Sequence, residues 1–267
     1  MDEKSFNNFR KLIFETSGIS LSEQKVALVA SRISKRMRGL SITSYDTYYQ
    51  LVVEDKAGNE LRELLNAIST NVTHFFRESR HFDFMGQLVR QWGEEGKTRL
   101  RIWCAACSTG EEPYTIAMTS LEAMPRPMDL KIMASDISTK VLHIAKFGVY
   151  KNSDVANISK PLLKKYFRKG VGKAAELVRV NPEIRNLVSY SQINLSTPPY
   201  PIEGGLDMIF CRNVMIYFDS DLRQKLVKNF ENLLRPGGVL FVGMAESLSG
   251  VSKSMKTLEP SVYQKIV

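Results

Sequence analysis

The sequence predicts an α/β fold in which helices cover both faces of a mainly parallel sheet, preceded by a domain made only of helices. Up to about Arg90, apolar residues recur every three or four positions, which is the period of amphipathic helices. From Leu100 onward, short apolar runs alternate with helical segments, as they do in doubly wound sheets. We therefore expect a helical domain with its linker at residues 1–90 and a sheet domain at residues 91–267.

The N-terminal part is expected to hold four or five short helices and no strands. Its apolar spacing indicates helices that end at Gly18 and Gly39, since glycine is the preferred residue after a helix C-terminus. A further helix is expected at about residues 78–92. The polar, glycine-containing stretch WGEEGK at Trp92–Lys97 then indicates a linker.

Beyond this linker, the expected strands and helices alternate along the chain. Apolar runs predict strands at RIWCAAC, LKIMAS, LVRV, LVSYSQI, LDMIFC and GVLFVGM. Helical patterns end at Met124 and cover the stretches Ser138–Lys146 and Asp219–Leu234. The segment at about residues 150–187 is longer than one crossover needs, so we expect a small inserted subdomain there.

The composition is that of a folded chain with a basic surface. Of the 267 residues, 43% are hydrophobic, which is enough for a substantial core. No apolar run approaches the roughly 20 residues that cross a bilayer, and the start, MDEKSFNNFRK, lacks an apolar signal stretch. We therefore expect a cytoplasmic protein. The net charge of +9 implies an anionic partner, such as nucleic acid, an acidic protein surface or a membrane face.

Three cysteines, Cys104, Cys107 and Cys211, lie in or beside the expected buried strands. An odd number cannot pair completely, so we expect reduced thiols in the core rather than a disulfide framework. Cys104 and Cys107 form a CxxC pair, but no further Cys or His stands at ligand spacing. Burial is therefore favoured over a zinc or redox role, and no metal is expected.

The turn after the first strand of a doubly wound sheet is where ligands bind, and here it reads AACSTGEEPYTIAM. Its small residues, among them Ala106, Ser108 and Gly110, allow a ligand to approach the backbone. Glu111 and Glu112 stand at the start of the next helix, where they would repel a pyrophosphate but tolerate the cationic aminoacyl end of S-adenosylmethionine. The alternative is a pair of favourable helix-start charges. S-adenosylmethionine is therefore favoured over a dinucleotide.

Three polar residues follow later strands. Asp136, in ASDIS, can accept hydrogen bonds from ribose hydroxyls, although it is equally suited to cap the helix that follows. Asn194, in SQINL, and Asn213, in IFCRNVMIYFD, can both donate and accept, which suits adenine or an amino acid moiety. The alternative is a buried asparagine that satisfies loop backbone groups. Together with the first turn, these residues favour a nucleoside ligand.

In this order, TNVTHFFRESRHF, AACSTGEEPY, ASDIS, IFCRNVMIYFD and the stretch from LRPGG to ES resemble the chemotaxis receptor methyltransferase family (CheR). The resemblance covers almost the whole chain. It implies a class I, Rossmann-like methyltransferase fold with an all-helical N-terminal domain and a small inserted β-subdomain. It also implies an enzyme that transfers methyl groups from S-adenosylmethionine to glutamate side chains of chemoreceptors. The products would be glutamate methyl esters and S-adenosylhomocysteine, formed in signal adaptation.

The resemblance also implies which residues contact the cofactor. Arg77 would hold its carboxylate, a bidentate task that suits a guanidinium. Glu111 would meet its amino end, with Glu112 as the second choice, and Asp136 would hold the ribose. The remaining contacts would come from Asn71, Thr73, Asn194, Leu195, Asn213 and Val214. Without the resemblance, the first two of these are simply good capping types for the helix that follows.

Methyl transfer from a sulfonium to a carboxylate is an in-line displacement. Glutamate has a pKa of about 4.3 and is already ionised at neutral pH, so no general base is required. Alignment of the reactants and exclusion of water should therefore supply most of the catalysis. Tyr217, just past Asn213, is the candidate to orient the acceptor carboxylate or to pack near the sulfonium. The alternative for this tyrosine is a core aromatic residue at a strand end.

A basic helix is expected at Ser22–Gly39. Its apolar residues and its cations fall on roughly opposite faces, and no acid stands between Glu23 and Asp46. This pattern favours a docking surface for an acidic partner over a plain solvated face. The resemblance supplies that partner, the glutamate-rich cytoplasmic helical bundle of a chemoreceptor, and the expected contacts are Arg32, Lys35, Arg36 and Arg38. Whether the inserted subdomain also grips a receptor's C-terminal peptide, as in some family members, stays open.

Two other functions compete with this interpretation. A nucleic-acid methyltransferase would share the core and the basic charge. However, no NPPY-like tetrad occurs and aromatic residues are not interleaved with the basic helix, so no nucleic-acid partner is expected. A non-catalytic adaptor that keeps the fold is disfavoured by the full set of polar residues expected around the pocket.

Overall fold

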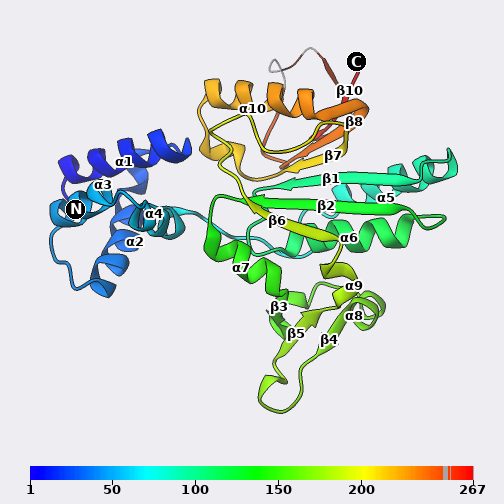
Figure 1. The fold of residues 1–267 in the computed structure, drawn as a ribbon, viewed down its shortest axis with the longest axis horizontal. Helices are drawn as coiled ribbons and strands as arrows, with labels where there is room; N and C mark the ends of the chain where they lie inside the picture. Colours follow the sequence, from blue (N-terminus) through cyan, green and yellow to red (C-terminus); the bar gives the residue numbers. More distant parts are fainter. Residues whose placement is uncertain (249–251, 253, 267) are drawn as a thin grey trace.

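The computed structural model describes residues 1–248, 252 and 254–266 of the chain. Figure 1 shows a group of helices on one side, a central twisted sheet with its own helices, and a small subdomain that projects from the sheet. The predicted α/β fold, with an all-helical N-terminal domain and an inserted β-subdomain, is therefore confirmed. None of the described helices combines the length and the hydrophobicity that a bilayer crossing requires.

The residues before 70, all of which are described, form the helical domain. They fold into α1 (Glu3–Ser17), the short 3₁₀ helix η1 (Glu23–Lys25), α2 (Val26–Gly39), α3 (Tyr45–Glu54) and α4 (Asn59–Ile68). The apolar faces of these helices enclose a core of their own, in which Phe9, Ile13 and Ile33 are fully buried. Because this core is separate from that of the sheet, the helices form a distinct domain.

Helix ends in this domain follow the sequence signals only in part. The Asp2 side chain accepts a hydrogen bond of 2.8 Å from the Ser5 amide and starts α1. Gly18 then ends α1 in the left-handed conformation, with φ 71°, so this predicted C-cap is confirmed. The C-cap predicted at Gly39 is wrong, because Gly39 is the last helical residue and Leu40 follows it as the cap.

Helix α5 (Arg80–Glu94) packs with the sheet and not with the helical domain. Phe82 and Met85 lie in the core that covers one face of the sheet, beside α6 (Glu111–Ala123). The linker expected at Trp92–Lys97 begins later, since α5 continues to Glu94. The domain limits at residues 90 and 91 stay a prediction.

The central sheet has seven described strands. Their spatial order is β6 (Val188–Gln192), β2 (Asp129–Asp136), β1 (Arg99–Ala105), β7 (Leu206–Cys211), β8 (Leu234–Val242), β10 (Val262–Lys265) and β9 (Met255–Glu259). The first five run parallel, whereas β10 is antiparallel to both β8 and β9. These five follow the 3-2-1-4-5 order of doubly wound folds, in which ligands bind where the order reverses. Here that point lies between β1 and β7.

Alternation along β1 explains how one strand serves two cores. Successive side chains of a strand point to opposite faces of the sheet. Leu100 and Ile102 lie in the core covered by α5, α6 and α7 (Thr139–Phe147), whereas Trp103 lies in the core covered by α10 (Ser220–Leu233). Both faces of β1 are thus covered by packed helices, and this holds the end of the strand, where the loop begins, in place.

The three cysteines behave as expected from the sequence. Cys104, Cys107 and Cys211 are free thiols and almost completely buried. Burial raises the pKa of each thiol well above its ordinary value. They are therefore protonated core residues at neutral pH.

The chain between α7 and β6 forms the inserted β-subdomain. It contains β3 (Val149–Lys151), η2 (Asn152–Val155), α8 (Lys160–Tyr166), β4 (Phe167–Lys169), η3 (Gly172–Ala174), β5 (Leu177–Val180) and α9 (Pro182–Arg185). The three strands make an antiparallel sheet in the order β3-β5-β4. In Figure 1 this sheet lies below the central sheet, on the side of α6 and α7.

Candidate active site

A cleft with about 880 Å³ of open space lies at the carboxyl ends of β1, β2 and β7, where the strand order reverses. The loops after these strands form its walls together with the segment that joins the helical domain to α5. The predicted residues that line it are Asn71, Thr73, Arg77, Asp136, Asn194, Leu195, Asn213, Val214 and Tyr217. Glu111 was predicted as well and does not line it.

Left-handed backbone conformations gather around this cleft. Phe76, Glu78, Ala106, Ser108 and Asn213 have φ values of 54°, 57°, 61°, 49° and 57°. For residues other than glycine such conformations cost about 1–3 kcal/mol each, and they persist where the surrounding contacts hold them. Strain of this kind is typical of ligand-binding loops.

Asp136 holds the loop after β1. Its carboxylate accepts a hydrogen bond of 2.9 Å from the Ser108 amide and another of 2.9 Å from the Ser138 amide. Burial raises the pKa of Asp136, although the two amides act in the opposite direction. Each oxygen keeps a lone pair that can accept from a hydroxyl group. Asp136 thus fixes the loop and remains suited to a ribose.

Asn194 has a structural task in addition to lining the cleft. Its amide nitrogen donates to the Thr16 carbonyl at 2.6 Å, and its oxygen accepts from the Ser196 amide at 3.0 Å. The side chain therefore fastens the end of α1 to the sheet domain. This is the backbone-satisfying role that the sequence left open as an alternative for this residue.

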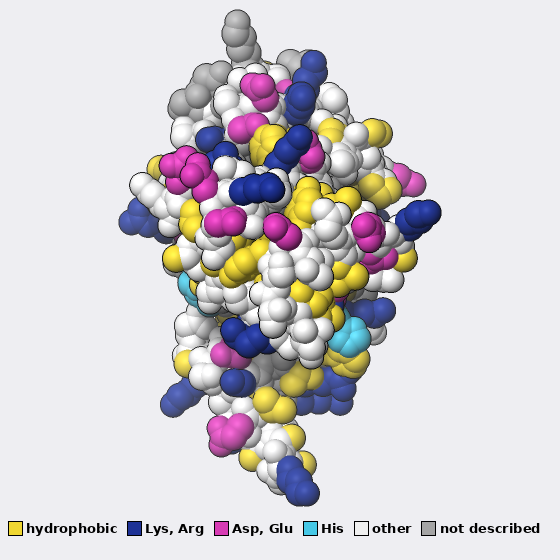
Figure 2. Space-filling model, turned by 90° about the vertical axis from the view of Figure 1, so that its left-hand side faces the viewer, with side chains coloured by type: hydrophobic (Ala, Val, Ile, Leu, Met, Phe, Trp, Pro, Cys, Tyr) yellow, Lys and Arg dark blue, Asp and Glu magenta, His cyan; other side chains and the backbone are white. Residues whose placement is uncertain are grey.

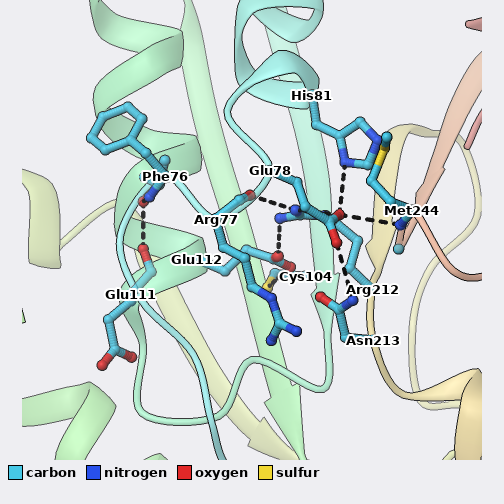
Figure 3. A network of polar contacts seen from close by, with 12 residues as sticks. Phe76, Arg77, Glu78, His81, Cys104, Glu111, Glu112, Arg212, Asn213 and Met244 are labelled. Atoms are coloured by element: carbon cyan, nitrogen blue, oxygen red, sulfur yellow. Dashed lines mark hydrogen bonds and ion pairs between the residues drawn. The ribbon is translucent and has the colours of Figure 1, made fainter. Parts of the chain in front are cut away.

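Arg212, directly after β7, is the centre of a buried ionic network that the sequence did not predict (Figure 3). Its side chain is 1% exposed and donates to Glu112 Oε2 at 2.5 Å and to Glu78 Oε2 at 2.9 Å. It also donates to the Arg77 carbonyl, and its guanidinium lies 5.2 Å from the Phe82 ring centroid. One guanidinium thus joins β7, the start of α6 and the segment before α5. A charged residue directly after six buried strand residues was the available signal.

Two carboxylates, Glu78 and Glu246, hold the loops around Asn213. Glu78 accepts from the Asn213 side chain at 3.2 Å, and Glu246 accepts from the Asn213 amide at 2.8 Å. Glu246 also accepts from the Gly243 amide at 2.6 Å. A Cβ atom at Gly243 would lie 2.6 Å from the Asn213 side-chain nitrogen, so only glycine fits there. The loops after β7 and β8 are therefore held as one unit.

The two adjacent acids of the GEEPY motif point in different directions (Figure 3). Glu112 lines the cleft and binds Arg212, and its other oxygen accepts from the Cys104 thiol at 3.2 Å. Glu111 is 7% exposed and accepts from the Thr109 hydroxyl at 2.7 Å. Burial raises the pKa of Glu111, which disfavours its charged form. The lining thus contains Glu112, the second choice of the sequence analysis, and not Glu111.

Tyr217 lies where the helical domain meets the cleft. Its ring is half-buried and lies 5.1 Å from Lys25 Nζ. The Tyr217 carbonyl accepts a hydrogen bond of 2.8 Å from the Ser20 amide. Tyr217 thus lines the cleft and also serves as a contact between the two domains.

The four cations expected as a docking surface on α2 differ in their surroundings. Arg36 makes two hydrogen bonds to Glu60, of 2.8 and 2.6 Å, and Arg32 donates to the carbonyls of Ile68 and Ser69. Lys35 and Arg38 are exposed. Figure 2, which views the molecule from the helical domain, shows basic and acidic side chains on this face. Glu60 of α4 thus neutralises part of the charge of α2.

Replacing Arg36 by alanine is expected to destabilise the helical domain by roughly 2–3 kcal/mol, because it leaves Glu60, which is 8% exposed, without its guanidinium. Burial alone would raise the pKa of Glu60, but hydrogen bonds from Arg36 and Tyr48 outweigh it and hold the pKa below its usual value. The Arg36–Glu60 pair therefore stabilises the helical domain above about pH 4.3, and this stabilisation is lost as the pH falls further. Urea unfolding should therefore give Arg36→Ala a lower free energy of unfolding than the unaltered protein at neutral pH. In acid the two free energies should become similar. Arg38→Ala, on the exposed side of α2, is the control, and equal losses in both variants would contradict the expectation.

The fold and the cleft define a class I methyltransferase that uses S-adenosylmethionine. Residues 4–69 match the CheR methyltransferase all-alpha domain, and residues 71–264 match the CheR methyltransferase SAM binding domain. The chain therefore belongs to the CheR methyltransferase family. It is 37% identical over 264 residues to the chemotaxis protein methyltransferase of Escherichia coli (strain K12), covering 98% of this chain and 91% of that one. It is 41% identical over 261 residues to chemotaxis protein methyltransferase 2 of Pseudomonas aeruginosa, covering 97% and 92%.

The side chains around the cleft fit the chemical groups of S-adenosylmethionine. Arg77 offers a guanidinium to a carboxylate, and Glu112 offers a carboxylate to an ammonium group. Asp136 offers acceptors for ribose hydroxyls, while Leu195 and Val214 offer apolar contacts to a flat base. The charged, polar and apolar groups at the cleft thus match those of the cofactor that the family uses.

Proposed function

We propose that this chain transfers methyl groups from S-adenosylmethionine to glutamate side-chain carboxylates of chemoreceptors in the cytoplasm. The products are glutamate methyl esters and S-adenosylhomocysteine, formed in signal adaptation. The observation that carries the proposal is the cleft itself, whose predicted polar residues come together in a chain of the CheR family. The relatives of this chain are named chemotaxis protein methyltransferases, which supports chemoreceptors as acceptors.

Within this proposal, different side chains of the cleft contact different parts of the cofactor. Arg77 holds the cofactor carboxylate, and Asp136 holds the ribose. Glu112 is placed better than Glu111 to meet the amino group, because it lines the cleft. The other contacts to the adenine and methionine portions come from Asn71, Thr73, Asn194, Leu195, Asn213 and Val214. For Asn194, whose side chain is already bonded, this leaves mainly backbone contacts.

The reaction needs no proton transfer. S-adenosylmethionine supplies a methyl group on a positively charged sulfur. An oxygen of the acceptor carboxylate, ionised at neutral pH, forms the new C–O bond as the C–S bond breaks and its electron pair stays on sulfur. The task of the protein is therefore to align the carboxylate with the methyl group and to exclude water. Tyr217 lies at the cleft, where its ring can flank the sulfonium or orient the carboxylate.

Labelled S-adenosylmethionine tests the acceptor. The protein is incubated with tritiated methyl donor and either membranes that contain chemoreceptors or nucleic acid. Base-labile label on the receptors is expected, since methyl esters hydrolyse in alkali. Label on RNA or DNA, or no label on receptors while S-adenosylhomocysteine still binds, would overturn the proposal. The latter outcome would support a non-catalytic adaptor.

For the receptor's helical bundle we propose docking on α2 through its exposed cations. Reversing charge at Lys35 and Arg38 is expected to lower kcat/KM for receptors about tenfold or more, since each cation lost near an acidic partner weakens encounter and binding. The affinity for S-adenosylhomocysteine should not change, because neither residue lines the cleft. Arg32 and Arg36 are the remaining predicted contacts, but their reversal would also disturb the helical domain.

A second charge-reversal pair is the control for this prediction. Lys225 and Lys228 are exposed on α10, three residues apart like Lys35 and Arg38, and their reversal changes the net charge equally. Receptor methylation is measured at several salt concentrations. Charge reversal on α2 should reduce it, and charge reversal on α10 should not. If both pairs reduce kcat/KM to the same extent, net charge and not a docking surface is responsible.

A further inference from the structure

The segment of residues 71–78, which carries Arg77 into the cleft, is held by the β-subdomain. Phe75 is fully buried, and its ring lies 5.0 Å from that of Tyr150 in β3 and 5.6 Å from that of Phe167 in β4. Asn157, in the loop before α8, donates a hydrogen bond to the Phe75 carbonyl. Three parts of the subdomain thus converge on one residue that stands two positions before Arg77.

The loop after β1 is held by the same subdomain. The Tyr150 hydroxyl donates to the Thr109 carbonyl at 2.8 Å, directly beside Ser108 at the cleft. A Cβ atom at Gly110 would lie 2.8 Å from the same hydroxyl oxygen, so the loop passes close to the end of the Tyr150 side chain. Tyr150 is 4% exposed and therefore a fixed support.

We infer that the β-subdomain supports two of the segments that bind S-adenosylmethionine, residues 71–78 and the loop after β1, with Tyr150 and Asn157 as positioning residues. The inference rests on the proposed function of the cleft. Neither residue lines the cleft; they bind the carbonyls of Thr109 and Phe75, which stand one residue from Ser108 and two residues from Arg77 in its lining. The subdomain thereby contributes to cofactor affinity, whatever it contributes to binding an acceptor.

Backbone conformation explains why such support is needed. Phe76 and Glu78 flank Arg77 in left-handed conformations, and Ser108 precedes Thr109 in another. Residues other than glycine leave such conformations unless neighbouring contacts hold them. The hydrogen bonds to the Phe75 and Thr109 carbonyls fix the chain on the subdomain side of both strained stretches. Without them, the loops would sample conformations in which Arg77 and Ser108 no longer face the cofactor together.

Tyr150→Phe in the full chain tests this inference, because it removes one hydroxyl and keeps the ring against Phe75. The dissociation constant for S-adenosylhomocysteine, measured by calorimetry, is expected to rise about 3–10-fold, the usual effect of one neutral hydrogen bond. Asn157→Ala should have an effect of the same size. In methylation assays the KM for S-adenosylmethionine should rise in step, while the KM for the acceptor stays unchanged.

Tyr166→Phe is the matched control. Tyr166 lies in the same subdomain, at the end of α8, and its hydroxyl donates to Glu122, at the end of α6 opposite to the loop after β1. Its loss should leave the affinity for S-adenosylhomocysteine unchanged. The inference is overturned if Tyr150→Phe and Asn157→Ala bind S-adenosylhomocysteine like the unaltered protein, or if Tyr166→Phe weakens binding as much. Because binding needs no acceptor, a failure to methylate receptors would refute the proposed function and leave this test intact.

Discussion

Replacing Arg212 by methionine is expected to lower the affinity for S-adenosylhomocysteine at least about 100-fold and to destabilise the sheet domain by about 3–5 kcal/mol. The variant leaves Glu78 and Glu112, whose side chains are 19% and 12% exposed, without the guanidinium that binds both. Burial would raise the pKa of Glu78, but Arg212 outweighs it and holds the pKa below its usual value. Removing Arg212 therefore leaves two largely buried carboxylates without their cation, which is costly. It also releases the Arg77 carbonyl, so Arg77 loses its place in the cleft.

Arg235→Met separates a specific effect on the cleft from a general loss of stability. Arg235 also binds a buried carboxylate, Asp207, and lies 4.7 Å from an aromatic ring, that of Trp92, but it does not line the cleft. This variant should lose stability and keep its affinity for S-adenosylhomocysteine. Chemical unfolding and calorimetry on both variants provide the comparison. If Arg212→Met binds S-adenosylhomocysteine as tightly as Arg235→Met does, the network does not position the cofactor loops.

A second substitution can confirm the reason for the instability. Glu78→Gln added to Arg212→Met removes one of the two carboxylates that have lost their partner. Part of the free energy of unfolding should return, because a neutral amide is less costly to bury than a charge. The cofactor affinity should remain low, since the loops are still not joined. A double variant less stable than Arg212→Met would contradict this account.

The cleft could be located from the sequence because its polar residues stand at or just after the ends of the apolar runs that predict the strands. Parallel strands covered on both faces read as continuous apolar runs, and the first polar residue after such a run marks the carboxyl end. Asp136, at the end of β2, was found in this way, and Asn213 was found two residues after the end of β7, next to Arg212. Since the strand order reverses between β1 and β7, these ends converge on one site.

The ionic networks could not be found in this way, because their partners are distant in the sequence. Arg212 is 134 residues from Glu78 and 100 from Glu112, and only the fold brings them together. Arg36 is 24 residues from Glu60, which stands on another helix. A search for acids within the basic helix and its flanks therefore missed the acid that neutralises it. For the same reason, two of the four expected docking cations are already engaged inside the protein.

The direction of a side chain at a helix start is a further feature that the sequence does not specify. Adjacent residues on a helix point about 100° apart, so only one of Glu111 and Glu112 can face a given cleft. The family resemblance favoured Glu111 and gave Glu112 as the second choice. The choice depends on how α6 is rotated against the sheet, and that rotation is set by packing along its whole length. Glu112 faces the cleft because Glu111 is turned toward Thr109 and the interior.

Glu112→Gln is therefore expected to weaken binding of S-adenosylhomocysteine by about 10–100-fold, the range for losing one charged partner of an ammonium group. Glu111→Gln is the matched control, being the same change at the neighbouring residue. It should alter the affinity less than about threefold, because burial already disfavours the charge of Glu111 and a glutamine oxygen can still accept from Thr109. Calorimetry with S-adenosylhomocysteine at neutral pH measures both constants.

The two glutamine variants also separate the two roles of Glu112. If its charge serves only to pair with Arg212, Glu112→Gln should lose stability and cofactor affinity in proportion, as Arg212→Met does. If it also binds the amino group, the loss of affinity should persist for S-adenosylhomocysteine and vanish for an analogue that lacks this group. The opposite pattern, in which Glu111→Gln weakens binding and Glu112→Gln does not, would restore Glu111 as the residue that holds the amino end. That result would require α6 to rotate when the cofactor binds, since Glu111 is 7% exposed and turned away from the cleft without it.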